Sequence, residues 1–235
     1  MRWRRHKDVV IDGQAKRYYL SHSEFFRDID MKAIDALVPS VPMEQVSKGH
    51  TFFLPGDQVE GLFIIKKGRV KLYRIASDGR VLTVAILGYG DVFGKMSVLG
   101  LASSGTGAEV LADALVCIMP NRVAREFILG YPKAGLRLLE QMETRLEEME
   151  TRLEDFTFGT VATRLAKLLL QLDQEQTNSI ADFTHQEMAD ILGVYRETVS
   201  QTLGTLRAAG IIELKRKCIS ILDREKLQSL AESRE

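Results

Sequence analysis

Hydrophobic residues follow two different spacings along this chain, and the change of spacing divides it into parts. Between about residues 49 and 120, short runs of β-branched and aromatic residues alternate with glycine turns. Runs of this kind are typical of strands, and strands at such regular intervals predict an antiparallel sandwich or roll. Beyond about residue 134 apolar residues recur every three or four positions instead, which predicts helices.

The strands of the predicted roll can be placed from their apolar runs. We expect separate strands at 62–65, 69–75 and 81–87, with a turn at Gly68, and a further apolar strand at 114–119. Asn121 follows the last of these strands. Its side chain is expected to cap a short helix that extends to residue 129.

A long helix is predicted from about residue 134 to residue 156. Its apolar positions are separated alternately by three and four residues, which is the a/d spacing of a coiled coil. These positions are Leu139, Met142, Leu146, Met149, Leu153 and Phe156. So narrow a seam needs a partner helix, which favours a homodimer in which Arg145 faces Glu150 of the second copy. The alternative is a monomer whose stripe packs on its own roll.

Two short helices joined by a tight turn are predicted at 184–201. Thr184 and Glu187 have the spacing of a capping box, which fixes the start of the first helix, and Gly193 permits the turn. The inward face of the second helix is apolar, with Val199, Leu203 and Leu206. Its outer face carries only polar or small residues, namely Arg196, Glu197, Ser200, Gln201 and Gly204. This pattern is typical of a helix-turn-helix DNA reader.

The outer face of the second helix suits the edges of bases. Arginine can donate two hydrogen bonds to guanine, glutamate accepts from cytosine, glutamine binds adenine, and hydroxyl groups suit phosphates. A hairpin with basic residues near its tip is predicted at 211–222, as in the wing of a winged helix. The candidate DNA-binding residues are Arg196, Glu197, Gln201, Ser200, Thr198, Thr184, His185, Tyr195, Lys215 and Lys217. The alternatives are an ordinary solvated helix and a winged helix that contacts protein.

The composition is that of a soluble globular protein. Of the 235 residues 45% are hydrophobic and 27% are charged, and 32 basic residues balance 32 acidic ones. With no net charge, the chain can attract nucleic acid only through a local cluster of positive charge, and the basic residues between 193 and 217 form such a cluster. With no apolar run of membrane-spanning length and no signal peptide, we expect a cytoplasmic protein with no membrane partner. Residues 1–21 are expected to form an N-terminal extension whose basic start is a solubilising tail, with contact to DNA or to another partner as the alternative.

Signatures of catalysis are missing from the sequence. There is no P-loop, nucleophile elbow, HExxH motif or catalytic pair of carboxylates, so the chain is not expected to be an enzyme. Cys117 and Cys218 cannot ligate a four-cysteine iron–sulfur cluster, and their apolar neighbours are typical of buried thiols. The four histidines show no metal-ligand spacing, so we predict neither a metal nor a cofactor.

The order of roll, long helix, break at Gly159 and winged helix resembles the Crp/Fnr family of bacterial transcription regulators. The most specific matches are Gly-Asp-Val-Phe-Gly at 90–94 and Gly-Val-Tyr-Arg-Glu-Thr-Val-Ser at 193–200. The resemblance implies an α+β fold. Its parts would be an antiparallel β-roll like that of cyclic nucleotide-binding domains at 22–133, a dimerisation helix and hinge at 134–158, and a winged helix-turn-helix at 159–235. It also implies a homodimer that reads palindromic promoter sites in double-stranded DNA and recruits or blocks RNA polymerase.

The effector pocket is where the chain departs from the family pattern. Members that bind cyclic AMP carry a Gly-Glu pair and an Arg-Ser-Ala or Arg-Thr-Ala run, where this chain has Gly94-Lys95 and Thr106-Gly107-Ala108. Without the arginine, the cyclic phosphate loses a charge-assisted partner. We therefore predict that cyclic AMP does not control the protein, which has either no ligand, the favoured case, or an unidentified small effector. The corresponding pocket residues are Gly94, Lys95, Met96, Thr106, Gly107, Ala108, Arg145, Met149 and Glu150.

Overall fold

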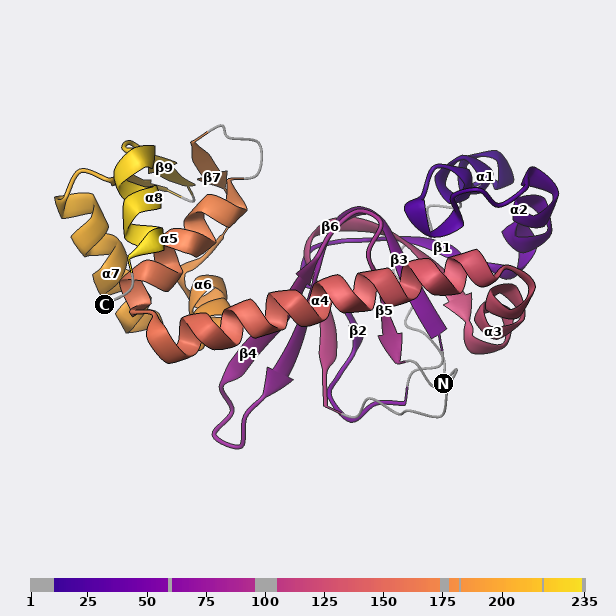
Figure 1. Cartoon of the computed structure of the whole chain (residues 1–235), viewed down its shortest axis with the longest axis horizontal. Helices are drawn as coiled ribbons and strands as arrows, with labels where there is room; N and C mark the ends of the chain where they lie inside the picture. Colours follow the sequence, from indigo (N-terminus) through magenta and orange to yellow (C-terminus); the bar gives the residue numbers. More distant parts are fainter. Residues whose placement is uncertain are drawn as a thin grey trace. The chain divides into compact units, whose positions relative to one another are not determined.

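The computed structural model describes residues 11–58, 61–95, 105–173, 178–181, 183–216 and 218–233. The chain forms two compact units, and Figure 1 labels their elements. The first unit takes in residues up to 75 together with 84–146. The second takes in 76–83 and the chain from 147 onward.

The first unit is built on a six-stranded sheet with the strand order β1-β6-β3-β4, in which β2 also pairs with β6 and β5 with β3. Its strands are β1 (Met43–Val46), β2 (Thr51–Phe53), β3 (Gly61–Ile75), β4 (Val81–Leu87), β5 (Val92–Lys95) and β6 (Gly107–Pro120). β3 and β6 pair in antiparallel register from Gly61 opposite Pro120 to Tyr73 opposite Gly107. The predicted antiparallel β-roll is confirmed.

Strands β3 and β6 contribute side chains to two separate cores. Successive residues of a strand point to opposite faces of the sheet. Accordingly Leu62 and Ile64 join one buried cluster, while Phe63 and Ile65 join another that contains Phe53 and Phe93. Because both faces are covered, the runs at 62–65 and 114–119 are continuously apolar instead of alternating.

One predicted turn in the roll is wrong. Segments 62–65 and 69–75 form the single strand β3, whose register against β6 shifts between Ile65 and Val70. Gly68 has φ +86°, and a Cβ atom there would lie 2.3 Å from the carbonyl oxygen of Asp113. This glycine therefore allows a bulge within a continuous strand and does not end the strand.

Helices cover the first of the two cores in the same unit. They are α1 (Gly13–Ser21), η1 (Glu24–Phe26), α2 (Met31–Leu37), η2 (Val38–Ser40), α3 (Asn121–Gly130) and the start of α4 (Pro132–Phe158). Leu20 of α1 is fully buried, so part of the expected N-terminal extension at 1–21 belongs to the core. The N-cap of α3 is Pro120 with no side-chain hydrogen bond, so the expected cap by Asn121 is wrong.

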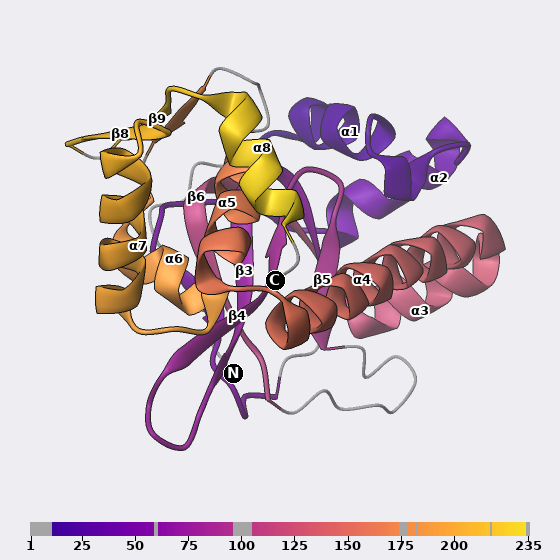
Figure 2. The same ribbon diagram turned by 60° about the vertical axis from the view of Figure 1, so that its left-hand side comes forward.

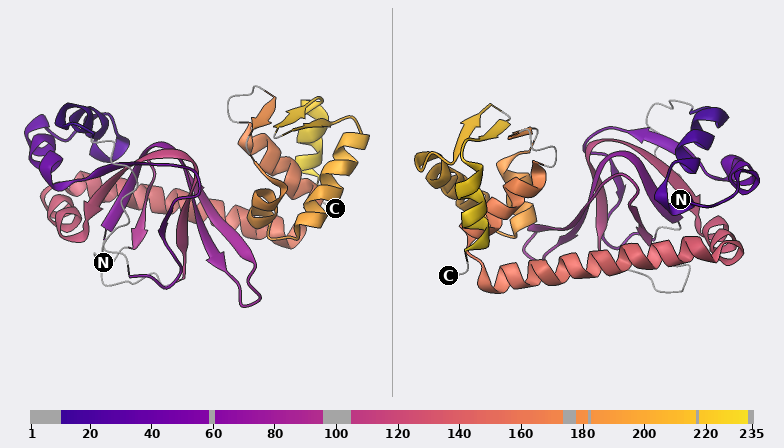
Figure 3. Two further views of the ribbon diagram at one scale, coloured as in Figure 1. Left: turned by 180° about the vertical axis from the view of Figure 1, so that it is seen from behind. Right: turned by 45° about the horizontal axis from the view of Figure 1, so that its top comes forward.

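Helix α4 is continuous from Pro132 to Phe158, as Figure 3 shows, and slightly longer than the predicted 134–156. Proline suits the first turn of a helix, because it lacks an N–H and the N–H groups of that turn have no partner within the helix. The helices of the described residues include none with the length and apolar character required to cross a membrane.

The second unit consists of small helices and a three-stranded sheet (Figure 2). Its elements after α4 are α5 (Val161–Leu172), β7 (Ser179–Ala181), α6 (His185–Leu192), α7 (Arg196–Ala208), β8 (Ile212–Lys215), β9 (Cys218–Ile221) and α8 (Arg224–Glu232). The sheet has the order β7-β9-β8, and one apolar core joins it to the helices. The predicted wing is the β8–β9 hairpin, whereas β7 was not foreseen.

Candidate nucleic-acid interface

Helix α6 begins where its capping box predicts. The Thr184 hydroxyl oxygen accepts from the Glu187 backbone N–H at 3.1 Å, and the Glu187 carboxylate accepts from the Thr184 N–H at 2.7 Å. The reciprocal pair satisfies two backbone donors that the first turn leaves without partners. A hydroxyl that accepts in this way keeps its own hydrogen for donation, so Thr184 has a donor available at the exposed end of the helix.

The turn between α6 and α7 depends on Gly193. This residue has φ 63° and ψ 33°, a left-handed conformation that glycine adopts at little cost. The Val194 N–H then donates to the carbonyl oxygen of Ala189 at 3.1 Å and closes the end of α6. The predicted helix-turn-helix geometry is confirmed at this position.

Helix α7 has one apolar and one polar face, as its sequence predicts. Val199, Leu203 and Leu206 are buried in the core of the second unit. Arg196, Glu197 and Gln201 are exposed, and Ser200 and Gly204 are partly exposed. In its first two turns this face offers the guanidinium of Arg196 and the amide of Gln201 as donors and the carboxylate of Glu197 as an acceptor. These groups can read base edges in a major groove.

A contact between the two helices was missed by the sequence analysis. Nδ1 of His185 lies 2.9 Å from the Ser200 hydroxyl oxygen, which donates in turn to the Arg196 carbonyl oxygen at 3.0 Å. A hydroxyl has one hydrogen, so the oxygen that donates to Arg196 accepts from Nδ1–H. This hydrogen bond fixes the orientation of the His185 ring and uses Nδ1 only, so Nε2 takes no part in it. Fifteen residues separate the partners, and no local pattern signals the pair.

The remaining predicted DNA-binding residues have different surroundings. Tyr195 is 62% exposed, and the guanidinium carbon of Arg80 lies 5.3 Å from its ring centroid. Thr198 is half-buried on α7. Lys215, exposed at the end of β8, pairs with Glu213 at 2.8 Å, and this hydrogen bond raises the pKa of Lys215. Lys217 lies outside the described residues.

The stripe on α4 that is predicted to form a dimer is largely exposed. Leu139, Leu146, Met149, Leu153 and Phe156 are between 43% and 68% exposed. Met142 differs, because it packs against the core beneath the N-terminal helices of its own unit. Arg145, expected to face a second copy, donates from Nη2 to the Val92 carbonyl oxygen at 3.1 Å.

Three of the residues that correspond to an effector pocket, namely Gly94, Gly107 and Ala108, are closely packed within the roll. A Cβ atom on Gly94 would lie 2.2 Å from the Gly61 carbonyl oxygen, and one on Gly107 would lie 2.5 Å from Cζ of Tyr73. Ala108 is fully buried and Thr106 half-buried. The backbone of Lys95 pairs with Gly61 at the end of β5. Met149 and Glu150 belong to the second unit, and Met96 lies outside the described residues.

Lys71, one of two buried lysines on β3, has an acidic partner. Nζ of Lys71 lies 3.2 Å from the Glu109 carboxylate and 5.5 Å from the Tyr73 ring centroid. Burial, with the nearby charges of Glu109 and Asp57, raises the pKa of Tyr73, so its hydroxyl stays neutral.

Comparison with known proteins identifies both units. The model of the Crp-like helix-turn-helix domain matches residues 163–230, and that of the cyclic nucleotide-binding domain matches residues 43–131. A CRP-like cAMP-activated global transcriptional regulator of Mycobacterium tuberculosis is 31% identical over 215 residues, which cover 88% of this chain and 96% of that protein. The chain belongs to the Crp/Fnr family of transcription regulators.

Two other relatives illustrate the likeness of this Crp/Fnr protein. A cyclic AMP receptor protein of Thermus thermophilus is 25% identical over 209 residues, covering 89% of this chain and 97% of its own length. The crystal structure of a Crp/Fnr-family regulator from Eubacterium rectale has a TM-score of 0.77 and covers 89% of this chain and 98% of that chain. Its 22% identity supports the shared fold alone. This is a family of transcription regulators and not of enzymes.

Proposed function

We propose that this Crp/Fnr regulator acts as a homodimer on palindromic promoter sites and does so without cyclic AMP. The observation that carries the proposal is the exposed polar face of α7, positioned by the left-handed turn at Gly193. Arg196 and Glu197 contact bases, Gln201 adjusts the preference, and Thr184, His185 and the wing residue Lys215 contact phosphates. Bound in this way, the dimer recruits or blocks RNA polymerase.

The exposed stripe on α4 supports the dimer. Apolar side chains at a/d spacing that lie in water in one chain are buried when two such helices pair. Burying them removes apolar surface from water at roughly 25 cal/mol per Å². A dimer also presents two copies of α7, and two reading helices about one DNA turn apart suit a palindrome.

Two features support independence from cyclic AMP. The sequence has Thr106 where cyclic AMP-binding members have the arginine that pairs with the phosphate. In addition, side chains of α4 bind directly to the backbone of the roll. Gln141 accepts from the Val92 N–H at 3.1 Å and donates to the Gly90 carbonyl oxygen at 3.0 Å. Arg145 donates to the Val92 carbonyl oxygen. The side chains of Gln141 and Arg145 thus bind the backbone of β5 and of the segment that precedes it.

The DNA-binding part of the proposal is tested by selecting bound oligonucleotides from a random pool. We expect a palindromic consensus and a fluorescence-anisotropy affinity for it that falls steeply as salt is raised, with a logarithmic slope of about −0.9 for each phosphate neutralised. Recovery of no consensus, together with equal affinity for all duplexes, would contradict sequence-specific binding.

The cyclic AMP prediction is tested by calorimetric titration of the purified protein. We expect no heat of binding and no change in affinity for the selected DNA, because losing one charge-assisted partner of a buried phosphate costs about 2–5 kcal/mol. A dissociation constant in the low micromolar range would overturn the prediction. Binding of DNA only after cell extract is added would instead favour an unidentified effector.

A further inference from the structure

Arg164 on α5 contacts the turn between the two DNA-reading helices. Its Nη1 donates to the carbonyl oxygen of Leu192 at 3.0 Å. Leu192 is the last residue of α6 and directly precedes Gly193. Carbonyl groups in the last turn of a helix lack partners within the helix, so the guanidinium satisfies one of them and holds the start of the turn.

The same guanidinium lies over an aromatic ring of the dimerisation helix. Its carbon is 4.6 Å from the ring centroid of Phe156 on α4. The ring also approaches the turn itself, because a Cβ atom on Gly193 would lie 3.3 Å from its Cε1 atom. Phe156, Arg164 and the Leu192–Gly193 peptide therefore form one contact group, all within the second unit.

The positive charge of Arg164 loses part of its hydration at this position, and this loss opposes burial of the guanidinium. A contact that forms despite this cost is not expected by chance. Arg164 is partly buried, and its Nε has no hydrogen-bond partner among the described residues. Loss of water lowers the pKa of Arg164, while the carboxylate of Asp155 favours the charged form. A planar guanidinium can stack on a ring and donate at its edge at the same time, which a lysine ammonium cannot reproduce.

We propose that Arg164 is a positioning residue that fixes the reading helices to the C-terminal end of the dimerisation helix, so that the packing of Phe156 sets the separation of the two recognition helices. Phe156 is the last residue of the α4 stripe and is 43% exposed, so it has surface left for a second copy. This inference rests on the proposed dimeric DNA binding. In it, the contact between Arg164 and Phe156 determines which spacing of the two half-sites the dimer binds best.

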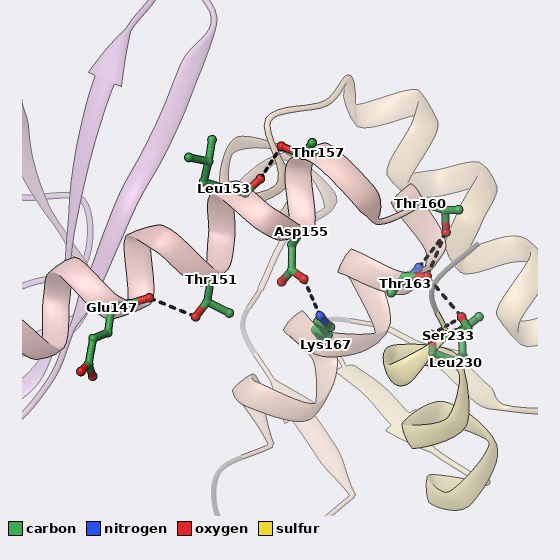
Figure 4. A network of polar contacts seen from close by, with 10 residues as sticks. All are labelled: Glu147, Thr151, Leu153, Asp155, Thr157, Thr160, Thr163, Lys167, Leu230 and Ser233. Carbon is green, nitrogen blue, oxygen red and sulfur yellow. Dashed lines mark hydrogen bonds and ion pairs between the residues drawn. The ribbon is translucent and has the colours of Figure 1, made fainter.

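A second contact joins α4 and α5 without reaching the turn. Figure 4 shows Lys167 of α5 paired with Asp155 of α4. It also shows the N-cap of α5, where the Thr160 hydroxyl accepts from the Thr163 N–H at 3.2 Å. The pair between Lys167 and Asp155 holds the two helices together whatever residue stands at 164. Removal of the Arg164 side chain should therefore alter the position of the turn without separating α4 from α5.

The test compares full-length wild type, Arg164→Met and Arg164→Lys. Each is titrated into the selected palindrome, into palindromes with the spacer lengthened or shortened by one or two base pairs, and into a duplex with one half-site. For Arg164→Met we expect a loss of about 10-fold on the best palindrome, less than about 3-fold on the single half-site, and a flatter preference for spacer length. Arg164→Lys should recover part of the loss, because it can still donate to Leu192.

Controls separate positioning from loss of folding or of the dimer. Arg122→Met, at an exposed arginine of α3, should retain the wild-type spacer preference, and light scattering should show a dimer for every variant. Phe156→Leu keeps an apolar seam but removes the ring. Its effect should combine with that of Arg164→Met to less than the sum, because both act through one contact.

Three outcomes would overturn the inference. They are a wild-type spacer profile for Arg164→Met, an equal loss on all duplexes including the single half-site, and strict additivity with Phe156→Leu. Failure of the wild type to bind any duplex would instead overturn the proposed function and this inference together.

Discussion

Lys66 carries an ammonium group into the apolar core beneath the N-terminal helices. Only 3% of the residue is exposed, Nζ has no hydrogen-bond partner among the described residues, and it lies 5.1 Å from the Phe26 ring centroid. Burial lowers the pKa of Lys66 from 10.5 to about 8. The charged form therefore opposes folding below pH 8, and this penalty disappears as the pH rises to 10.5, where the unfolded chain also loses the proton.

We predict that Lys66→Met raises the free energy of unfolding at pH 7 by about 1–3 kcal/mol, measured by urea denaturation. The advantage over wild type should shrink as the pH is raised from 8 to 10.5. Lys67→Met, at the exposed neighbouring position, should change stability little. A Lys66→Met protein less stable than wild type at pH 7 would show that the ammonium group stabilises this core.

A second prediction at the residue scale concerns base reading by Arg196. Arg196→Ala should relax selectivity at one guanine of each half-site and cost about 1–3 kcal/mol on the preferred sequence, because the bidentate contact is lost. Competition binding with single-base variants of the selected palindrome measures this. Arg207→Ala, at the exposed C-terminal end of α7, should keep the base preference. If Arg196→Ala weakened binding to every sequence equally, Arg196 would be a phosphate contact.

At the scale of elements, two glycines with almost the same φ angle differ in the space around them. Gly68 has φ +86° and faces the β6 backbone, whereas Gly79 has φ +85° and no atom within 4 Å of the position of a Cβ. We expect Gly79→Ala to cost about 1 kcal/mol from conformation alone. Gly68→Ala should cost more than about 3 kcal/mol, because the β3 bulge must also move away from Asp113. Thermal unfolding of both variants measures the difference, and similar costs would contradict a steric role for Gly68.

Elements defined by local signals were predicted well from the sequence. The capping box at Thr184, the glycine at 193 and the apolar spacing of α4 and α7 each act within a few residues, so they can be recognised without the fold. Elements that depend on distant partners were not. β7 has three residues and exists by pairing with β9, and β3 continues past Gly68 because β6 lies opposite.

At the scale of the whole molecule, the exposed apolar stripe on α4 predicts that two copies pair through this helix. Leu146→Lys places a charge in the seam, where it cannot be solvated in the dimer, so we expect monomers by light scattering and a large loss of affinity for the palindrome. Thr144→Lys, two residues away on an exposed face, should remain dimeric. A Leu146→Lys protein that is still dimeric and binds normally would mean that the copies pair through another surface.

The side-chain contacts that position the candidate site are those that the sequence could not supply. His185 and Ser200 are 15 residues apart, and Arg164 and Leu192 are 28 apart. The residue types on the DNA-facing helix follow from helical periodicity. The side chains that hydrogen-bond to residues on other helices are determined by how the second unit packs. That packing brings together residues far apart in the sequence, and no local pattern predicts it.

The two thiols differ in accessibility in a way that makes the protein convenient to label. Cys117 is fully buried and its pKa is raised to about 11 by desolvation, so it is a poor nucleophile near neutral pH. Cys218 is partly exposed at the start of β9, within the β8–β9 wing. A maleimide dye should therefore react at one natural position, in the wing, and its emission would test the proposed docking of the wing on DNA without any engineered cysteine.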